Sequence, residues 1–307
     1  AKRGAMIAAA GFHNLLMIGP PGVGKSMIAG RIPGILPPLT LEESLEVTGI
    51  FSVAGLLPQG QPLITRRPFY APHHTVTQAA LIGGGNGIPR PGMVSLAHRG
   101  VLFLDELPEF QKTVLDSMRQ PMEEHKVQIA RSAGMVTYPS DFILVAAMNP
   151  CPCGYYPDRN KCRCTQPQIE RYLGKISGPI LDRIDLCVEL HPVDILHLQK
   201  TKGEKSSEDM RQQIMRARNR QAERFAGSDC RFNGNIRSAR VETYCPLGEE
   251  ERKVMEQLYR TLQLSARAYH RILKTARTIA DLEEQEDISG DHLLEAACYR
   301  PSETYWN

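Results

Sequence analysis

The sequence has no apolar run that approaches the roughly 20 residues needed to cross a membrane. Its first residues, AKRGAMIAAAGFHN, also lack the separate apolar core and the cleavage site of a secretory signal peptide. We therefore expect a cytoplasmic protein with no membrane partner. The same stretch begins inside a helical pattern without a capping residue, so we expect the chain to be a piece of a longer protein.

The chain also has little net charge and too few cysteines for a disulfide scaffold. A formal charge of +3 in 307 residues gives no bulk attraction to nucleic acid, so any such contact must come from local basic patches. Eight cysteines in a chain of this length indicate a reduced cytosolic protein. With 42% hydrophobic residues, the chain can form a sizeable core, and its length suggests about two domains.

Four short apolar runs predict the buried strands of a parallel α/β sheet. Such strands are continuously apolar because helices cover both faces of the sheet. The runs are residues 14–19, 100–106, 141–149 and 182–190, and a helix is expected over 25–33. The stretch from Ile50 to His98 is rich in glycine, proline and histidine and is typical of loops and insertions.

Two further patterns predict the rest of the architecture. Apolar and polar residues alternate over 126–139, which predicts a β-hairpin that turns at residues 131–134. From about Ser206 the pattern becomes helical, with a serine cap followed by acidic residues. We therefore expect an α/β nucleotide-binding domain at residues 1–199 and an all-α lid domain at 200–307.

Residues 19–26 read GPPGVGKS, which matches the phosphate-loop pattern G-x-x-x-x-G-K-[ST] between an expected strand and an expected helix. The glycines let backbone N–H groups turn toward phosphates at a helix N-terminus. Lys25 is expected to reach the β- and γ-phosphates, and Ser26 to bind Mg²⁺. The pattern predicts ATP and Mg²⁺ as cofactors, held by Gly19, Pro20, Pro21, Gly22, Val23, Gly24, Lys25 and Ser26.

Asp105 and Glu106 follow the apolar run LFL directly. A carboxylate at the end of a buried strand is costly unless something charged needs it. We expect Asp105 to hold the Mg²⁺ shell and Glu106 to polarise the attacking water.

These motifs, together with RPFYAPHHT, LIGGG, AAMNP, NPCPCG, GPILDRIDL and SARAYHRILKTARTIADLE, resemble the magnesium-chelatase-like AAA+ ATPases, and most closely the ComM/YifB family. The resemblance covers nearly the whole chain and implies an AAA+ parallel sheet with a β-hairpin insertion, followed by an all-α lid. Members of the family carry a Lon-protease-like domain before this module, and it is absent from this sequence.

The resemblance also implies roles for three further residues. Asn149 resembles the polar sensor-1 residue near the γ-phosphate, Arg183 the arginine finger that reaches a neighbouring subunit's nucleotide, and Arg267 the sensor-2 arginine. A guanidinium suits this work because phosphoryl transfer is catalysed mostly by positioning and charge stabilisation. An arginine finger implies a ring, and the family suggests a homo-hexamer.

The family implies a DNA motor that drives branch migration in natural transformation and homologous recombination. The sequence supports this in part, because Lys126 and Arg131 lie in the expected hairpin and Arg90 in the glycine-rich segment 82–92, where each is a candidate for phosphate contact. The alternative is a protein-remodelling ATPase subunit like that of magnesium chelatase. Activation of ATP hydrolysis by DNA separates the two functions.

Other basic and histidine residues are expected to be structural. The arginines of 211–224 crowd one helix, and Arg271 and Lys274 share a helix face with Arg267. We expect solvated faces there, with Arg267 alone turned to ATP. His73 and His74 are adjacent in a loop, where we favour a structural or interface role over a metal site.

Four cysteines close together form two C-x-C pairs in a loop with little apolar content. Two thiolates from each pair could surround one tetrahedral ion, so we favour structural Zn²⁺, although C-x-C is tighter than the usual spacing. Free thiols and, in an oxidising setting, disulfides are the alternatives. The residues are Cys151, Cys153, Cys162 and Cys164.

Overall fold

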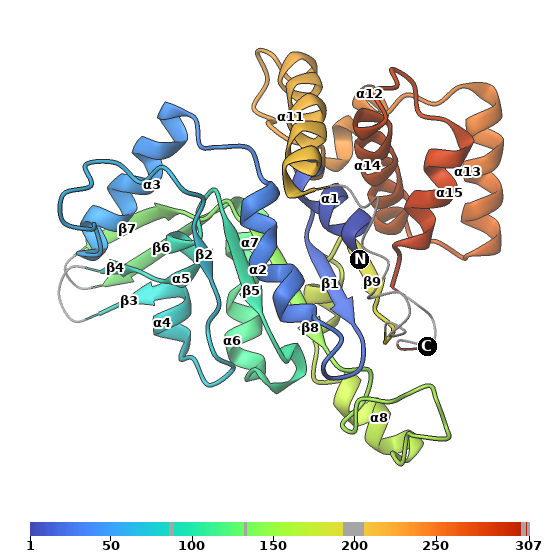
Figure 1. The fold of residues 1–307 in the computed structure, drawn as a ribbon, viewed down its shortest axis with the longest axis horizontal. Coiled ribbons are helices and arrows are strands. Elements are labelled where there is room, and N and C mark those ends of the chain that lie inside the picture. Colours follow the sequence, from blue (N-terminus) through green and yellow to red (C-terminus); the bar gives the residue numbers. More distant parts are fainter. Residues whose placement is uncertain (86–88, 132–133, 193–205, 302–304, 306–307) are drawn as a thin grey trace.

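The computed structural model describes residues 1–85, 89–131, 134–192, 206–301 and 305. Its centre is a parallel five-stranded sheet in the order β2-β5-β8-β1-β9 (Figure 1). The four strands expected from the apolar runs are present, which confirms the α/β class. The strands are β1 (Leu15–Ile18), β2 (Phe69–Tyr70), β5 (Val101–Leu104), β8 (Ile143–Met148) and β9 (Leu186–Glu189).

Both faces of this sheet are buried, which explains the uninterrupted apolar runs. Met17 and Phe103 point to the face covered by α1 (Lys2–Gly11) and α2 (Lys25–Ile35). Their neighbours Leu16 and Leu102 point to the opposite face and a second apolar cluster. Because successive strand residues alternate between faces, the chain needs apolar residues at every position here.

The stretch from residue 50 to 98 contains more structure than its composition indicates. Its two-residue strand β2 pairs in parallel with β5 and forms one edge of the main sheet. The last turn of α3 (Leu41–Ala54) also lies in this stretch. The remaining elements of the stretch are α4 (Gln78–Ile82), β3 (Gly83–Gly84), β4 (Arg90–Pro91) and α5 (Met93–Leu96). The turn η1 (Leu107–Glu109), α6 (Lys112–Ser117) and α7 (Arg119–Glu124) follow β5. The expectation of loops and insertions without regular structure is therefore wrong for these short elements.

The expected hairpin is present and packs on the glycine-rich segment. Strands β6 (Lys126–Arg131) and β7 (Gly134–Pro139) pair antiparallel, and residues 132–133 of the expected turn lie outside the described residues. The Tyr138 hydroxyl donates to the Pro89 carbonyl at 2.6 Å. A Cβ on Gly83 would lie 2.7 Å from Ile129 Cδ1. The hairpin and the β3–β4 pair thus form one unit at one end of the molecule (Figure 1).

The C-terminal part is helical, as expected. Its helices gather beside α1 and β9, at the end of the sheet opposite the hairpin (Figure 1). The expected boundary at residues 199–200 lies outside the described residues. None of the helices in the described ranges combines the length and apolar character of a membrane span. Beyond α8 (Gln166–Leu173) and α9 (Gly178–Leu181), the helices are α11 (Ser207–Arg224), α12 (Val241–Tyr244), α13 (Glu249–Thr261), α14 (Ala266–Leu282) and α15 (Gly290–Cys298), with short 3-10 turns at Asn233–Asn235 and Ser238–Arg240.

Candidate active site

The predicted phosphate loop connects the carboxyl end of β1 to the first turn of α2. Gly22 and Gly24 have φ angles of 79° and 86°, a region that glycine adopts without steric cost. Gly19 packs against the residue that follows β9, because a Cβ there would lie 2.6 Å from the Leu190 carbonyl oxygen. The three glycines of the motif are therefore each required by the backbone geometry.

Lys25 joins the phosphate loop to the expected sensor residue. Its Nζ donates to the carbonyls of Gly19 and Pro20 at 2.5 and 2.9 Å and to Asn149 Oδ1 at 3.0 Å. Burial lowers the pKa of Lys25, and the nearby Asp105 carboxylate opposes that shift. Asn149 follows β8, the strand beside β1, and therefore lies beside the loop; its sensor-1 role stays a prediction.

Ser26 and Asp105 meet in the geometry expected of a Mg²⁺ site. The Ser26 hydroxyl donates to Asp105 Oδ2 at 2.7 Å, and the Glu106 N–H donates to Asp105 Oδ1 at 2.9 Å. A hydroxyl and a carboxylate are the oxygen ligands that Mg²⁺ prefers. The residues present therefore fit a nucleotide whose phosphates carry Mg²⁺: Lys25 would neutralise phosphate charge, and Ser26 and Asp105 would hold the ion, directly or through water.

His74 contacts the predicted base. Its Nδ1 lies 3.1 Å from Glu106 Oε2, and its ring centroid lies 4.0 Å from that of His73. Because β2 and β5 are parallel neighbours, the residues that follow them meet at the same edge of the sheet. We did not expect this contact, since the two-residue β2 has no sequence periodicity.

Arg183 and Arg267 lie away from the phosphate loop. Both line a cavity of about 350 Å³ with Asn14 and Phe142, which precede β1 and β8, so the cavity lies at the amino edge of the sheet. The loop lies at the carboxyl edge, and a four-residue strand such as β1 spans about 13 Å. A nucleotide bound at the loop therefore lies too far from these two arginines of the same chain for them to contact it.

The cavity has an excess of positive charge. Arg183 pairs with Glu123, and Arg267 Nη1 donates to Asp182 Oδ2 at 2.6 Å. Burial lowers the pKa of Arg183, and repulsion from Arg119 and Arg267 adds to that shift. The Nε atom of Arg183 is buried and has no hydrogen-bond partner in the described part of the chain. An anion supplied from outside would relieve this repulsion.

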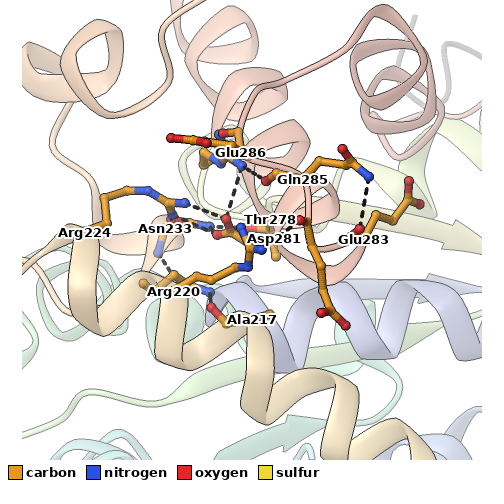
Figure 2. Close-up of polar contacts among 12 residues, drawn as sticks. Ala217, Arg220, Arg224, Asn233, Thr278, Asp281, Glu283, Gln285 and Glu286 are labelled. Carbon is orange, nitrogen blue, oxygen red and sulfur yellow. Dashed lines mark hydrogen bonds and ion pairs between the residues drawn. The ribbon is translucent and has the colours of Figure 1, made fainter.

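The expectation of solvated basic faces is wrong for four residues. Arg271 donates to the Ile184 carbonyl, and Lys274 Nζ to the Gly234 carbonyl at 2.8 Å, both in the same cavity. Arg218 lies 3.8 Å from the Phe232 ring centroid, and burial lowers its pKa to about 9. Arg224 pairs with the buried Asp281 inside the lid (Figure 2).

The four clustered cysteines form a compact sulfur site. All four Sγ atoms lie within 4.8 Å of one another, and three of the separations are 3.4, 3.6 and 3.8 Å. Zinc–sulfur bonds of about 2.3 Å place tetrahedral thiolates about 3.8 Å apart, so the cluster fits Zn²⁺. All four cysteines are free thiols in this structure, so no disulfide joins them. Burial raises the pKa of Cys153, but hydrogen bonds from backbone N–H groups and from the neighbouring Cys151 and Cys164 side chains together lower the pKa to about 6.

The expected DNA-binding residues lie on the hairpin unit. Arg90 and Lys126 are exposed; Arg90 pairs with Gly84 in the β3–β4 segment, and Lys126 lies at the base of the hairpin. Arg131 ends β6 and pairs with Gly134 beside the turn. Arg131 and Lys126 therefore occupy opposite ends of one strand.

The chain is similar to known proteins over nearly its full length. The family model described as "Magnesium chelatase, subunit ChlI" matches residues 1–198, and that described as "Magnesium chelatase, subunit ChlI C-terminal" matches residues 204–300. Competence protein ComM of Haemophilus influenzae is 46% identical over 98% of the chain, and the uncharacterized protein YifB of Escherichia coli is 47% identical over 97%. The chain spans 58% of the length of each. The magnesium-chelatase 67 kDa subunit of Chlorobaculum parvum is 25% identical over 52% of the chain and 24% of that protein.

Proposed function

Because the chain belongs to the ComM/YifB family of magnesium-chelatase-like AAA+ ATPases, we propose that it is an ATP-driven motor that acts on DNA as a homo-hexamer. The motor drives branch migration as a helicase or translocase. It acts in the cytoplasm, in natural transformation and homologous recombination. The name of the Haemophilus influenzae relative, a competence protein, supports the cellular role.

One observation carries the proposal of a ring. The phosphate loop, Asp105 and Asn149 lie at the carboxyl edge of the sheet, whereas Arg183 and Arg267 line a basic cavity at the amino edge. A complete catalytic site therefore combines the carboxyl edge of one subunit with the amino edge of the next. In this arrangement Lys25 and Mg²⁺ neutralise phosphate charge, Glu106 polarises the water, and the two arginines act in trans on the transferring group.

The hairpin unit supports DNA as the substrate of the motor. Arg131 lies beside the hairpin turn and Arg90 on the segment beneath it, and the Tyr138–Pro89 hydrogen bond joins the two. Backbone phosphates are contacted by arginine, lysine and backbone N–H groups, and glycine-rich backbone allows close approach. A net charge of only +3 gives no bulk attraction to DNA, which favours binding through a local surface such as this one.

ATP hydrolysis with and without branched DNA tests the function. A DNA motor hydrolyses ATP several times faster when a four-way junction is added, and it converts that junction to duplex products. Lys25→Ala is the matched inactive control. A rate that DNA leaves unchanged would favour the alternative, a remodelling subunit like that of magnesium chelatase, which the 25% identity to the Chlorobaculum parvum subunit also allows.

We further propose that Cys151, Cys153, Cys162 and Cys164 hold a structural Zn²⁺. Their sulfur separations support it, and four thiolates leave no position open for a catalytic water. Elemental analysis of protein purified without added metal should find about one zinc per chain. The Cys151→Ser/Cys164→Ser variant should lose it, whereas four freely titratable thiols in metal-free protein would refute the site.

A further inference from the structure

The four-cysteine loop touches the phosphate loop where Gly154 meets Pro21. Gly154 has a φ of 87°, and a Cβ on it would lie 2.6 Å from Pro21 Cδ. That separation is too short for two carbon atoms in contact, so only a residue without a side chain lets the loops approach this closely. Pro21 is the third residue of the phosphate loop, so the contact is made on the segment expected to bind nucleotide.

The cysteines determine where Gly154 lies. Its N–H donates to the Cys151 carbonyl at 3.0 Å, and it follows Cys153 directly in the chain. The Tyr156 N–H donates to Cys151 Sγ at 3.4 Å and closes the same turn. A metal ion bonded to both cysteines would fix this turn, and with it the backbone that presses on Pro21.

The same segment reaches the phosphate loop at a second point. Asn149 accepts a hydrogen bond from Lys25, and only Pro150 separates it from Cys151. Residues 149–154 therefore contact the loop at both Pro21 and Lys25. Pro20 through Gly24 are partly or fully exposed, and the packing of Val23 on the core restrains only part of the loop.

We propose that metal binding at the four cysteines sets the affinity for nucleotide, because the metal-bound turn holds the phosphate loop in its binding conformation through Gly154 and Asn149. This inference rests on the zinc site proposed above. The metal does not touch the nucleotide; it acts as a positioning element that lowers the cost of ordering the loop when phosphates bind.

The first experiment measures nucleotide affinity with and without the metal. The Glu106→Gln protein is titrated with a fluorescent ATP analogue and Mg²⁺ in three states: as purified, after chelation with the chelator dialysed away, and after Zn²⁺ is restored. We expect affinity to fall roughly tenfold in the second state, the scale of loss when groups that orient a site are removed, and to return in the third. Circular dichroism shows whether the chain stays folded.

The second experiment breaks the contact while keeping the metal. In Gly154→Ala the new Cβ collides with Pro21, so we expect zinc content near one per chain but weaker nucleotide binding. Gly227→Ala is the matched control, since Gly227 also has a positive φ of 76° but a Cβ there has no neighbour within 4 Å. Pro21→Ala removes the ring atoms that collide, so Gly154→Ala should cost little affinity when added to it.

The outcomes separate the inference from the site on which it rests. Protein without metal refutes the zinc site. Protein with one zinc per chain whose affinity survives both its removal and Gly154→Ala keeps the zinc site but refutes the coupling. If chelation unfolds the chain, the Gly154→Ala protein decides: unchanged affinity with zinc bound overturns the coupling, and reduced affinity relative to Gly227→Ala supports it.

Discussion

His74 Nδ1 lies 3.1 Å from Glu106 Oε2, so an imidazole from the neighbouring strand end contacts the predicted catalytic carboxylate. The Glu106 side chain is 57% exposed, and its backbone has a φ of 51°. An exposed carboxylate without a partner samples several rotamers. The contact with His74 therefore determines where the second carboxylate oxygen, Oε1, faces.

We predict that His74→Ala lowers the turnover number for ATP roughly tenfold and leaves nucleotide affinity unchanged, because a group that orients the base is lost and no phosphate contact is. His74→Asn should restore part of the rate, since its amide can donate a hydrogen bond to Glu106. Steady-state hydrolysis and fluorescent-nucleotide titration measure the two quantities.

His73→Ala is the control for that experiment. His73 stacks on His74 but makes its own hydrogen bond to Thr75 Oγ1 at 2.9 Å, so its loss should change turnover far less. Faster hydrolysis by His74→Ala would contradict the prediction. It would show that the contact with His74 inhibits Glu106 instead of orienting it for catalysis.

Substitutions of Lys25 and Glu106 should affect different steps, nucleotide binding and hydrolysis respectively. Lys25→Ala should weaken ATP binding tenfold to a hundredfold or more, because charge-assisted hydrogen bonds contribute about 1.5–3 kcal/mol. Glu106→Gln should bind ATP as the wild type does but stop turnover, because the amide cannot accept the proton of the attacking water. Wild-type hydrolysis by Glu106→Gln would remove it from the role of base.

Arg183→Ala should reduce hydrolysis by about a thousandfold or more while an isolated subunit keeps its ATP affinity, because in the proposed ring the guanidinium acts on the neighbour's nucleotide. Mixing this protein with Lys25→Ala checks the direction of action. Mixed rings contain interfaces that pair an intact phosphate loop with an intact Arg183, so partial activity should return. No recovery in rings shown to be mixed would contradict action in trans.

Arg131→Ala should weaken DNA binding and DNA-activated hydrolysis but spare basal hydrolysis. Loss of one phosphate contact should reduce the slope of log affinity against log salt by about one per engaged subunit. Arg260→Ala on α13 is the control, because that arginine is 81% exposed and lies outside the hairpin unit. An unchanged slope in the Arg131 variant would give the hairpin a structural role instead.

The apolar runs were enough to predict four of the strands, since burial on both faces leaves a signal in the sequence itself. The strand β2 left none: two residues, Phe69 and Tyr70, cannot show a period, and their pairing with β5 depends on residues some 30 positions later. The position of His74 beside Glu106 depends on that pairing. The phosphate loop and Asp105 could therefore be predicted from the sequence, whereas the partner of the predicted base could not.

The burial of Arg218 escaped prediction for a related reason. Its guanidinium lies over Phe232 and donates to the Ala9 carbonyl at 2.7 Å, a contact across 209 positions of chain. Helical periodicity shows which residues share a face but not what covers that face. The arginine-rich helix was therefore predicted to face solvent. The aliphatic stem and planar guanidinium of Arg218 are instead packed against aromatic rings.

The lid contains a buried charge cluster centred on Asp281 of α14 (Figure 2). Its carboxylate is fully buried and accepts hydrogen bonds from Arg224 at 2.5 and 2.8 Å and from Asn233 Nδ2 at 2.8 Å. Arg277 Nη2 lies 3.2 Å from the same group. Because Arg267 belongs to the first turn of α14, this cluster anchors the helix that presents Arg267 to the amino-edge cavity.

Asp281→Asn should therefore destabilise the chain by about 3–5 kcal/mol, since it leaves two guanidinium groups without their buried counter-charge. Urea unfolding measures this loss as a lower midpoint at constant slope. Glu284→Gln is the matched carboxylate-to-amide control: Glu284 pairs with Arg216, both side chains are about half exposed, and such surface pairs contribute about 0–1 kcal/mol. If the two variants unfolded at the same urea concentration, the buried cluster would not anchor α14, and the position of Arg267 would have to depend on its ion pair with Asp182 instead.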